Sequence, residues 1–466
     1  MNTRLTTSAL LSVIALLVAL TWTGCGRAPE RPNMVVIVTD TVRRDYTGPA
    51  GRSPSPTPAL DRLASEGTVF TDAWANGPWT VPSHASIFSG LLPSQHHCTG
   101  RSYRFESESP TFAELLSEDG YDAVAFYSNP WLTDTLTGML RGFEQHVVKP
   151  EERTNMFNQS DQGGPETVRN VERWLAERDR SRPFVLFVNL LEPHLPYAPP
   201  DDYRQRRLPD LPPDYVFETQ WALEYNARVR SGDRIDFAEV AKLYEGDVFA
   251  ADRHLGEIVE LVRAHAGDDE TVYIATSDHG ENLGDHGYMD HQFGVFDTLI
   301  EVPLVVVAPG ALAPGRRDDP VMLTDLYDTI LDLSGIEDGP DTPHSRSLLE
   351  PPAHEDRPLI TEYMGANPAL VRALKSLNPE LDTTREELAF SKVRVGNLEY
   401  TVASDGRETL YDLDADPERT DNLAFERPET ADLMLELMPA VRRESAEELE
   451  VDEEMKEWLR SLGYVQ

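Results

Sequence analysis

Residues 34–40 have the sequence Met-Val-Val-Ile-Val-Thr-Asp, an apolar run followed directly by a threonine and an aspartate. A continuous β-branched run without polar alternation is typical of a strand buried on both faces of a parallel sheet. Asp40 then lies at the carboxyl end of this strand, the edge at which open α/β sheets bind ligands. The stretch predicts an α/β fold with a site at Asp40, although an aspartate that caps the next helix explains Asp40 equally well.

The same pattern recurs downstream, where apolar runs alternate with amphipathic stretches. The predicted strands are 122–126, 184–188, 271–277 and 302–307, and the predicted helices between them are 110–120, 166–178 and 237–264. Alternating helices and buried strands predict a doubly wound sheet. Residues 201–236 carry prolines, arginines and tyrosines without a clear period, and we interpret them as a surface insertion near the mouth of the site.

The strand at 271–277 delivers Asp278, His279, Gly280 and Glu281 to its carboxyl end. A carboxylate and an imidazole side by side are the ligands that a divalent transition metal prefers. Gly280 lets the backbone approach closely. His286 and His291 follow within the next twelve residues, whereas the whole chain has only 12 histidines, which favours a site over an isolated structural histidine.

The stretch from Thr80 to Gly90 predicts a helix whose N-terminus is a candidate position for a nucleophile. Pro82 suits a first helical position, and Thr80 or Ser83 can cap the free N–H groups there. The positive end of the helix dipole favours an anion or a developing alkoxide at the same place. A hydroxyl that only caps a buried helix is the alternative interpretation.

The chain has 466 residues and a formal net charge of −39, which excludes a nucleic-acid-binding protein. A carboxylate-rich surface tolerates self-repulsion best where salt screens it, so the composition indicates a halophilic protein. The length predicts one large domain of about 300 residues and a smaller one.

The N-terminus predicts export. Arg4 precedes an apolar run from Ala9 to Leu20, which is too short to span a bilayer comfortably and has the layout of a secretory signal. The Gly24–Cys25 step resembles the lipobox of bacterial lipoproteins, although Trp22 stands where that motif has leucine. We therefore predict a signal peptide at 1–24, a lipidated Cys25 that anchors the protein to a membrane, and a tether at 25–32, giving a periplasmic or membrane-anchored lipoprotein.

Past Leu348 the sequence becomes acidic, and short alternating runs predict a small antiparallel sheet followed by a charged helix at 440–463. The predicted domains are accordingly 33–347, which carries the site, and a C-terminal subdomain at 348–466.

Taken together, these motifs resemble the sulfatase family of the alkaline-phosphatase-like superfamily, in their order and spacing over nearly the whole mature chain. The matching segments are Asp40-Thr41-x-Arg43-x-Asp45, Thr80-x-Pro82-Ser83-His84, Gly142-Phe143, Pro193-His194-x-Pro196-Tyr197, Ser277-Asp278-His279-Gly280-Glu281, Val302-Pro303-Leu304, Leu410-Tyr411-Asp412-Leu413-x-x-Asp416-Pro417-Glu418 and Asn422-Leu423. The resemblance implies a mixed, mostly parallel central sheet between helix layers, followed by a smaller domain with a four-stranded antiparallel sheet.

The resemblance also implies roles for single residues. Asp40, Asp278 and His279 would bind one divalent metal ion, which Thr80 also reaches. His194 and His291 match positions that contact the anionic group of the substrate or protonate its leaving oxygen, which makes the substrate an anionic ester.

The sequence departs from the family in its reactive residues. Sulfatases carry Cys or Ser, converted to formylglycine, where this chain has Thr80, and Arg where it has His84. Thr41 replaces the second of two paired aspartates, and His279 replaces an asparagine that binds calcium. Family habit thus indicates calcium, whereas two carboxylates, an imidazole and a hydroxyl favour manganese or zinc. His84 is a candidate proton acceptor for Thr80 or a structural hydrogen-bond partner.

These observations predict an exported metal-dependent hydrolase of sulfate or phosphate and phosphonate esters with Thr80 as its nucleophile. Two alternatives stay open. The first is a transferase that passes a phosphoryl headgroup from Thr80, because the Asp, Thr, Asp, His pattern of this chain resembles that of phosphoethanolamine transferases. The second is a sulfatase-like protein that only binds anions.

The acidic composition makes a prediction about salt. The free energy of unfolding should rise as potassium chloride is increased from low to multimolar concentration, because added salt screens the repulsion between surface carboxylates. Equilibrium unfolding in urea at a series of salt concentrations measures this, and a stability that does not change with salt would refute the halophilic interpretation.

Overall fold

The computed structural model describes residues 31–100, 102–148, 162–212, 214–229, 235–266 and 271–439. The predicted signal peptide, Cys25, most of the tether and the helix at 440–463 lie outside these residues, and the boundary at 347/348 stays a prediction. In the part of the chain that is described, no helix is long and apolar enough to cross a membrane.

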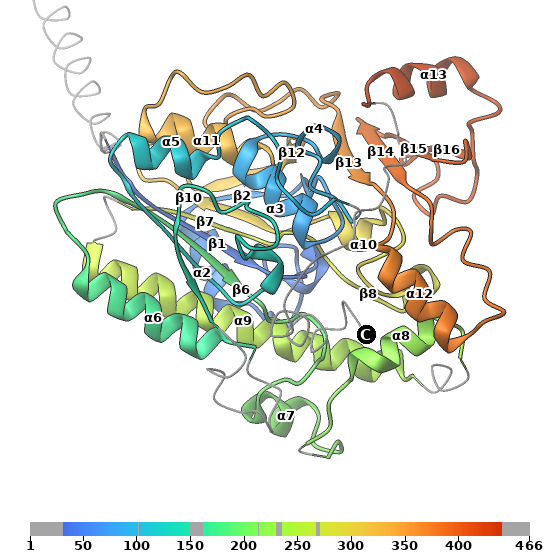
Figure 1. The fold of residues 1–466 in the computed structure, drawn as a ribbon, viewed down its shortest axis with the longest axis horizontal. Helices are drawn as coiled ribbons and strands as arrows, with labels where there is room; N and C mark the ends of the chain where they lie inside the picture. The colour runs from blue at the N-terminus through green and yellow to red at the C-terminus, as the bar shows by residue number, and fades with distance from the viewer. Residues whose placement is uncertain are drawn as a thin grey trace, which may run out of the picture.

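A mixed, mostly parallel sheet of eight strands forms the centre of the molecule (Figure 1). Its order is β11 (Gly315–Arg317), β2 (Thr68–Phe70), β10 (Leu304–Val307), β7 (Thr271–Thr276), β1 (Asn33–Thr39), β6 (Phe184–Leu190), β4 (Asp122–Tyr127) and β5 (Glu144–Val147). Only β10 runs against the others, since it pairs antiparallel with both β7 and β2. The predicted strands and the predicted fold class are confirmed.

Strand β1 is buried on both faces, as its unbroken apolar run predicts. Successive side chains of a strand point to opposite faces, and accordingly Met34, Val36 and Val38 pack into one hydrophobic cluster while Val35 and Ile37 pack into another. Helices cover both faces, which explains why no polar residue interrupts the strand.

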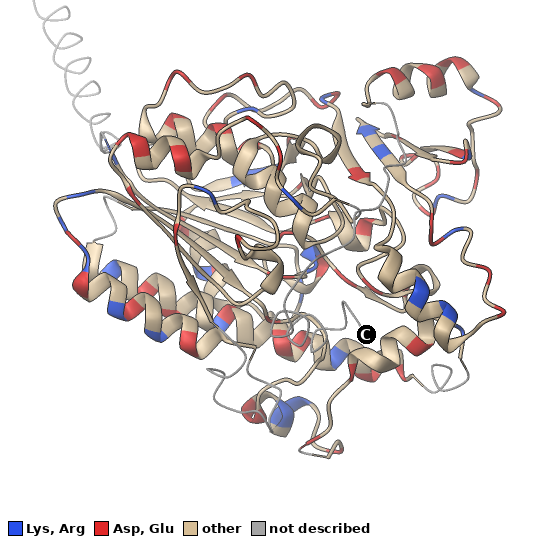
Figure 2. Cartoon of the chain, in the orientation of Figure 1, with Lys and Arg blue, Asp and Glu red and all other residues tan. Residues whose placement is uncertain are grey.

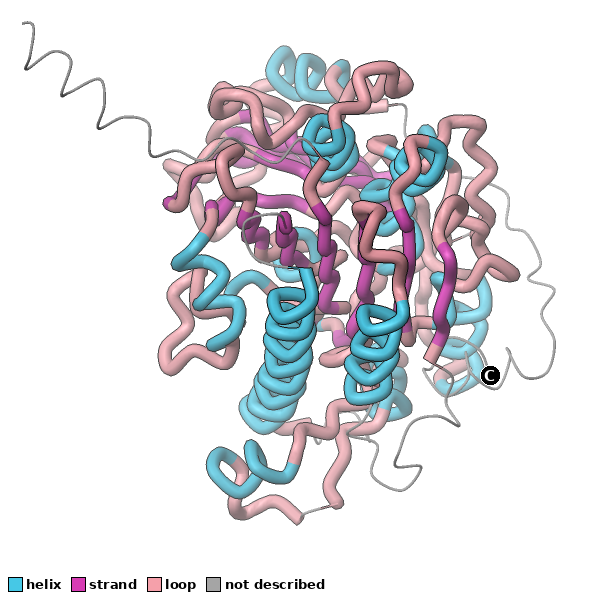
Figure 3. The backbone as a smooth tube through the Cα atoms, turned by 90° about the vertical axis from the view of Figure 1, so that its left-hand side faces the viewer, coloured by secondary structure: helices cyan, strands magenta, loops and turns pink. Residues whose placement is uncertain are grey.

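One helix layer holds α2 (Pro58–Glu66), α6 (Gly164–Glu177) and α9 (Phe237–Ala266), and α2 and α6 each contact α9. The other holds α3 (Thr80–Ser89), α5 (Phe112–Glu118) and α11 (Asp325–Ser334). Figures 1 and 3 show the strands between these two layers. Acidic and basic residues lie mainly on the helices and the loops, and the strands of the central sheet carry few (Figure 2).

A separate antiparallel sheet of four strands follows near the C-terminus, as predicted. Its strands are β13 (Leu359–Tyr363), β14 (Phe390–Val395), β15 (Leu398–Ala403) and β16 (Glu408–Asp412), and α13 (Pro428–Glu436) packs on β15. Trp74 and Ile300 of the main body share a hydrophobic cluster with Ile360 and Tyr400 of this sheet, so the two parts have a common core.

Residues 201–236, interpreted as a surface insertion from a sequence without a clear period, contain two helices that the sequence analysis did not predict. The segment contains α7 (Asp201–Arg207) and α8 (Thr219–Asn226), and Phe217 and Ala222 are buried beside Met289. Asn226 ends α8 with its side-chain amide bonded in both directions to Met289, since Asn226 Nδ2 donates to the Met289 carbonyl and its Oδ1 accepts from the Met289 N–H, both at 2.9 Å.

Candidate active site and metal centre

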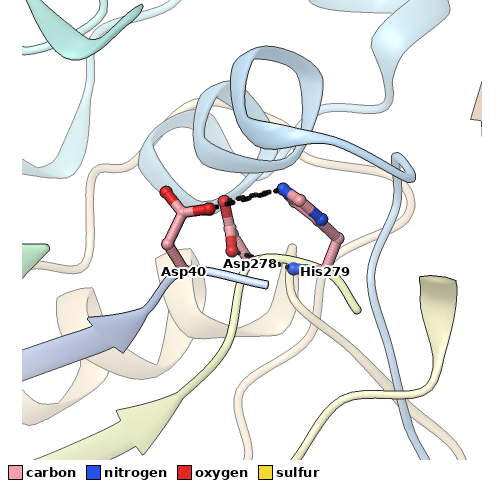
Figure 4. Close-up of side chains that lie close together, drawn as sticks. All are labelled: Asp40, Asp278 and His279. Atoms are coloured by element: carbon pink, nitrogen blue, oxygen red, sulfur yellow. Dashed lines mark hydrogen bonds and ion pairs between the residues drawn. The ribbon is translucent and has the colours of Figure 1, made fainter. Parts of the chain in front are cut away.

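The carboxyl ends of β1 and β7 bring Asp40 and Asp278 together, with His279 beside them (Figure 4). All three side chains are fully buried. Nε2 of His279 lies 3.3 Å from Oδ2 of Asp278 and 3.8 Å from Oδ1 of Asp40. Two carboxylate oxygens and one ring nitrogen therefore face one point, although 238 residues separate Asp40 from Asp278.

The tautomer of His279 is set by the backbone. Its Nδ1 lies 2.9 Å from the carbonyl oxygen of Gly280, an acceptor, so Nδ1 carries the proton and Nε2 presents a lone pair to the carboxylates. Gly280 is required here because a Cβ would lie 2.0 Å from the Thr298 carbonyl oxygen, which confirms the predicted close backbone approach.

Each carboxylate has one oxygen held by the protein and one without a hydrogen-bond partner in the described structure. Oδ1 of Asp278 accepts from the N–H groups of Thr41 and His279, and Oδ2 of Asp40 accepts from Asn129 and Asn189. Asp40 Oδ1 and Asp278 Oδ2 are buried and accept none. Unpartnered oxygens aimed at an imidazole lone pair fit a divalent cation well.

Burial and the charge of Asp278 raise the pKa of Asp40 to about 7 in the absence of a cation. Two like charges in a dry site cannot both ionise without compensation, so a metal ion and a proton compete for this pair.

Thr80 reaches the same point from the helix layer above the sheet. It is fully buried, and its Oγ1 lies 3.5 Å from Nε2 of His279. The prediction that Thr80 or Ser83 caps the helix is wrong, because α3 already begins at Thr80 and no side chain caps it. Ser83 instead donates its hydroxyl to the Asp278 carbonyl at 2.6 Å, which ties the helix to the end of β7.

Asn129 follows β4 and was missed by the sequence analysis, because a lone asparagine after a strand has the appearance of a turn residue. Its Oδ1 accepts from the N–H of Trp131, which fixes the amide so that Nδ2 points into the site. Nδ2 donates to Asp40 Oδ2 at 2.7 Å and to Thr80 Oγ1 at 3.3 Å. One amide thus positions both a metal ligand and the candidate nucleophile.

Thr41 has a φ of 61°, a conformation that costs free energy for a β-branched residue. Its carbonyl accepts from the Tyr244 hydroxyl at 2.6 Å, and the next N–H, of Val42, donates to the Ser277 hydroxyl at 2.8 Å. These bonds hold the turn after β1 so that the Thr41 N–H reaches Asp278.

His84 lies one helical turn after Thr80. Its Nδ1 lies 3.0 Å from the Thr80 carbonyl and 3.4 Å from Asp278 Oδ2, and its ring packs against Phe88 and Phe187. Burial lowers the pKa of His84, which keeps the ring neutral. The observed bond is to the main chain of Thr80, so the geometry favours the structural alternative; proton transfer by His84 stays a prediction.

His194 and His291 lie close to His279. The ring centroid of His291 is 4.5 Å from that of His279 and 5.1 Å from that of His194. Burial lowers the pKa of His194 to about 3. Burial also opposes a charge on His291, but the carboxylates of Asp290 and Glu281 outweigh it and raise the pKa of His291 well above its usual range. All seven predicted site residues therefore lie in one buried region, whereas His286 stacks on Phe296.

A sequence profile described as Sulfatase matches residues 32–336, well over half of the chain. The chain belongs to the sulfatase family. It is 24% identical to arylsulfatase K of Mus musculus over 447 residues, covering 86% of this chain and 77% of that protein. It is also 24% identical to the Delta 4,5-hexuronate-2-O-sulfatase of Bacteroides thetaiotaomicron over 446 residues, covering 86% of each. Among solved structures, the phosphonate monoester hydrolase of Agrobacterium radiobacter has a TM-score of 0.69 at 21% identity, covering 87% of this chain and 94% of that one.

Membership of the sulfatase family confirms the predicted family and the predicted class of enzyme, a hydrolase of sulfuric or phosphoric esters. The place of Thr80 in the family's formylglycine position stays a prediction, as do the roles of the site residues. The geometry adds a candidate metal centre made of Asp40, Asp278 and His279.

We predict that Asp40→Ala and Asp278→Ala each abolish activity together with binding of the metal ion at this centre. Removing one carboxylate from so small a ligand set should weaken binding of the ion by more than about 100-fold, since loss of groups that merely support a ligand already costs 10- to 100-fold. Elemental analysis after dialysis, with rates on the same samples, measures both.

Asp252→Ala is the matched control. Asp252 is also buried, but it accepts hydrogen bonds from the N–H groups of Ala59 and Leu60 at the start of α2, away from the site. This variant should lose stability and keep its metal. Full metal content in either Asp40→Ala or Asp278→Ala would show that the assigned centre is wrong.

Proposed function

We propose that the protein is an exported, metal-dependent ester hydrolase that uses unmodified Thr80 as its nucleophile and cleaves phosphate diesters or phosphonates at least as well as sulfate esters. The observation that carries the proposal is the position of the Thr80 hydroxyl, buried at the N-terminus of α3 within 3.5 Å of Nε2 of His279. The helix dipole and the Asn129 amide both favour negative charge on this oxygen.

The substrate class follows from the chemistry of one hydroxyl. Hydrated formylglycine has two, so that after one is sulfated the other expels sulfate by cleavage of the carbon–oxygen bond. Threonine has one, and a sulfated Thr80 could be cleared only by attack of water on sulfur. A phosphorylated Thr80 can be cleared by the same in-line displacement at phosphorus that formed it.

In the first step, Thr80 Oγ1 would lose its proton and bond to phosphorus as the bond to the leaving oxygen breaks, and the leaving oxygen would take up a proton. In the second, water bonds to phosphorus and the bond to Thr80 Oγ1 breaks, which restores the hydroxyl and releases the phosphate or phosphonate. His194 and His291 lie close to His279, where they would contact the anion or protonate the leaving oxygen.

Asp40, Asp278 and His279 would hold the metal ion, with Thr80 next to it. When bound, a divalent ion lowers the pKa of a hydroxyl and neutralises an anionic ester. The imidazole and the short list of oxygens favour manganese or zinc over calcium, which takes six to eight oxygen ligands.

We predict that Thr80→Ala lowers kcat on a phosphodiester by a factor on the order of 10⁴ or more, because it removes the nucleophile. Thr80→Ser keeps the hydroxyl and should retain most of the rate. Thr167→Ala is the control, since Thr167 is a buried helical threonine outside the set of site residues, whose hydroxyl donates to the Gly163 carbonyl and lies 3.5 Å from the Ser128 hydroxyl.

Rates on matched aryl sulfate and phosphodiester substrates, with mass spectrometry of the peptide that contains position 80, complete this test. We expect an unmodified threonine and no preference for sulfate. A clear preference for the sulfate, with Thr80→Ala still active, would contradict both the nucleophile and the substrate class. No turnover of either ester, in protein that still binds sulfate or phosphate, would favour the anion-binding alternative.

Export and lipidation form a separate part of the proposal, based on the apolar run and the Gly24–Cys25 step. A single acyl-bearing N-terminus would hold the enzyme at a membrane surface. In a bacterial host that exports lipoproteins, Cys25→Ser should move the protein from the membrane fraction to the soluble periplasmic fraction. Unchanged fractionation would refute the anchor without affecting the assignment of the site.

A further inference from the structure

A second group of potential metal ligands lies beside the first, and it too contains buried polar atoms without a hydrogen-bond partner in the described structure. It consists of Glu281, Asp290 and His291, whose ligand atoms lie within 4.8 Å of one another. Nδ1 of His291 is 2.8 Å from Oδ1 of Asp290 and 3.5 Å from Oε1 of Glu281. Three atoms of the kind that bind metals thus converge on one point.

Hydrogen bonds do not account for this convergence. His291 and Glu281 are fully buried, yet neither ring nitrogen of His291 and neither carboxylate oxygen of Glu281 has a hydrogen-bond partner with acceptable geometry in the described structure. Buried polar atoms are almost always paired, so four unpaired atoms in one place call for an occupant. Asp40 Oδ1 and Asp278 Oδ2 show the same pattern in the first centre.

The charge of the region points the same way. Asp40, Asp278 and Glu281 are fully buried, and the side chain of Asp290 is 23% exposed. The nearby guanidinium of Arg43 is already bonded to Asp45 and Asp285. One divalent cation balances two of these four carboxylates, and a second balances the other two.

From these observations we infer a second divalent-cation site, formed by Glu281, Asp290 and Nδ1 of His291, directly beside the Asp40–Asp278–His279 centre. Two carboxylates and one imidazole are a donor set for Zn²⁺ or Mn²⁺. The His291 ring lies 4.5 Å from the His279 ring, so the two cations would form a paired centre able to contact one substrate from two sides. Since Nδ1 faces the carboxylates, Nε2 of His291 stays available to the substrate.

Helix α8 and the loop that carries Asp290 and His291 hold the second group in place. Asn226 bonds to both backbone groups of Met289, the residue before Asp290. Asp290 has a φ of 72°, and in this conformation its Oδ1 also accepts from the N–H of His291 at 2.6 Å. This loop presents a carboxylate and an imidazole from neighbouring residues to the same point.

The test counts metal ions and does not depend on the role of Thr80. Full-length protein freed of metal with a chelator is dialysed against Mn²⁺ or Zn²⁺ alone, and bound metal is measured by elemental analysis. We expect two ions per chain. Glu281→Gln and Asp290→Asn should each reduce this to one, and Asp40→Ala should leave one ion bound at the second group.

Asp285→Asn is the matched control, because Asp285 lies in the same loop but pairs with Arg43, so this variant should bind two ions. Anomalous diffraction from crystals of the unmodified protein soaked in Zn²⁺ gives a measurement independent of how the variants fold, and should show a peak between Glu281 and His291. One ion per chain in the unmodified protein, two ions retained in Glu281→Gln, or a single anomalous peak at Asp40 would overturn the inference. In that case the two carboxylates would pair with a protonated His291 in place of a cation.

Discussion

Repulsion between two buried carboxylates is the constraint on which the rest of the site depends. Asp40 and Asp278 end adjacent parallel strands, are wholly shielded from water and point toward the same nitrogen of His279. A buried pair of like charges is unstable unless a cation or a proton lies between them. This repulsion, together with burial, raises the pKa of Asp40. The site is therefore strongly disposed to bind a divalent ion, and the surrounding structure has to keep the two carboxylates in place when it does.

Backbone and amide groups perform this task by holding one oxygen of each carboxylate. Asp278 is fixed by the N–H groups of Thr41 and His279, and Asp40 by the amides of Asn129 and Asn189. Oxygens held in this way cannot rotate toward other partners, so the remaining two stay aimed at the metal position. The left-handed Thr41 fits the same account, because its strain persists only where the Tyr244 and Ser277 hydroxyls fix the turn.

The sequence predicted what depends on strand periodicity and on residues placed at strand ends. The unbroken run before Asp40 and the run before Asp278 each indicate a buried parallel strand, and parallel strands have their carboxyl ends at one edge. Asn129 could not be found this way, because its importance lies in which way its amide faces, and Trp131 decides that. The capping role of Thr80 and Ser83 was mispredicted for a related reason: capping rules assume that a hydroxyl at a helix end serves the helix, whereas Thr80 Oγ1 faces Nε2 of His279 and Ser83 donates to the Asp278 carbonyl.

Helices α7 and α8 were missed because their few apolar residues are interspersed with prolines and charged residues and show no clear helical period. These apolar residues are buried only through the hydrophobic cluster that also contains Met289. Tertiary contact, and not local preference, makes this segment regular. Asn226 illustrates the consequence, since an asparagine in a segment without clear periodicity turns out to hold the loop that carries Asp290 and His291.

The net charge of −39 imposes a last condition on a protein whose relatives act on anionic esters. Charged side chains gather on the outer helices and loops, so their field repels an approaching anion at long range (Figure 2). At about 0.15 M salt this field decays over about 8 Å, and over about 3 Å at 1 M. Attraction must therefore arise inside the site. Arg43 cannot supply it, because its guanidinium is bonded to Asp45 and Asp285. On the proposed assignment, the buried acidic groups make binding of an anionic substrate feasible, because divalent cations held by them would present positive charge to the ester inside the site.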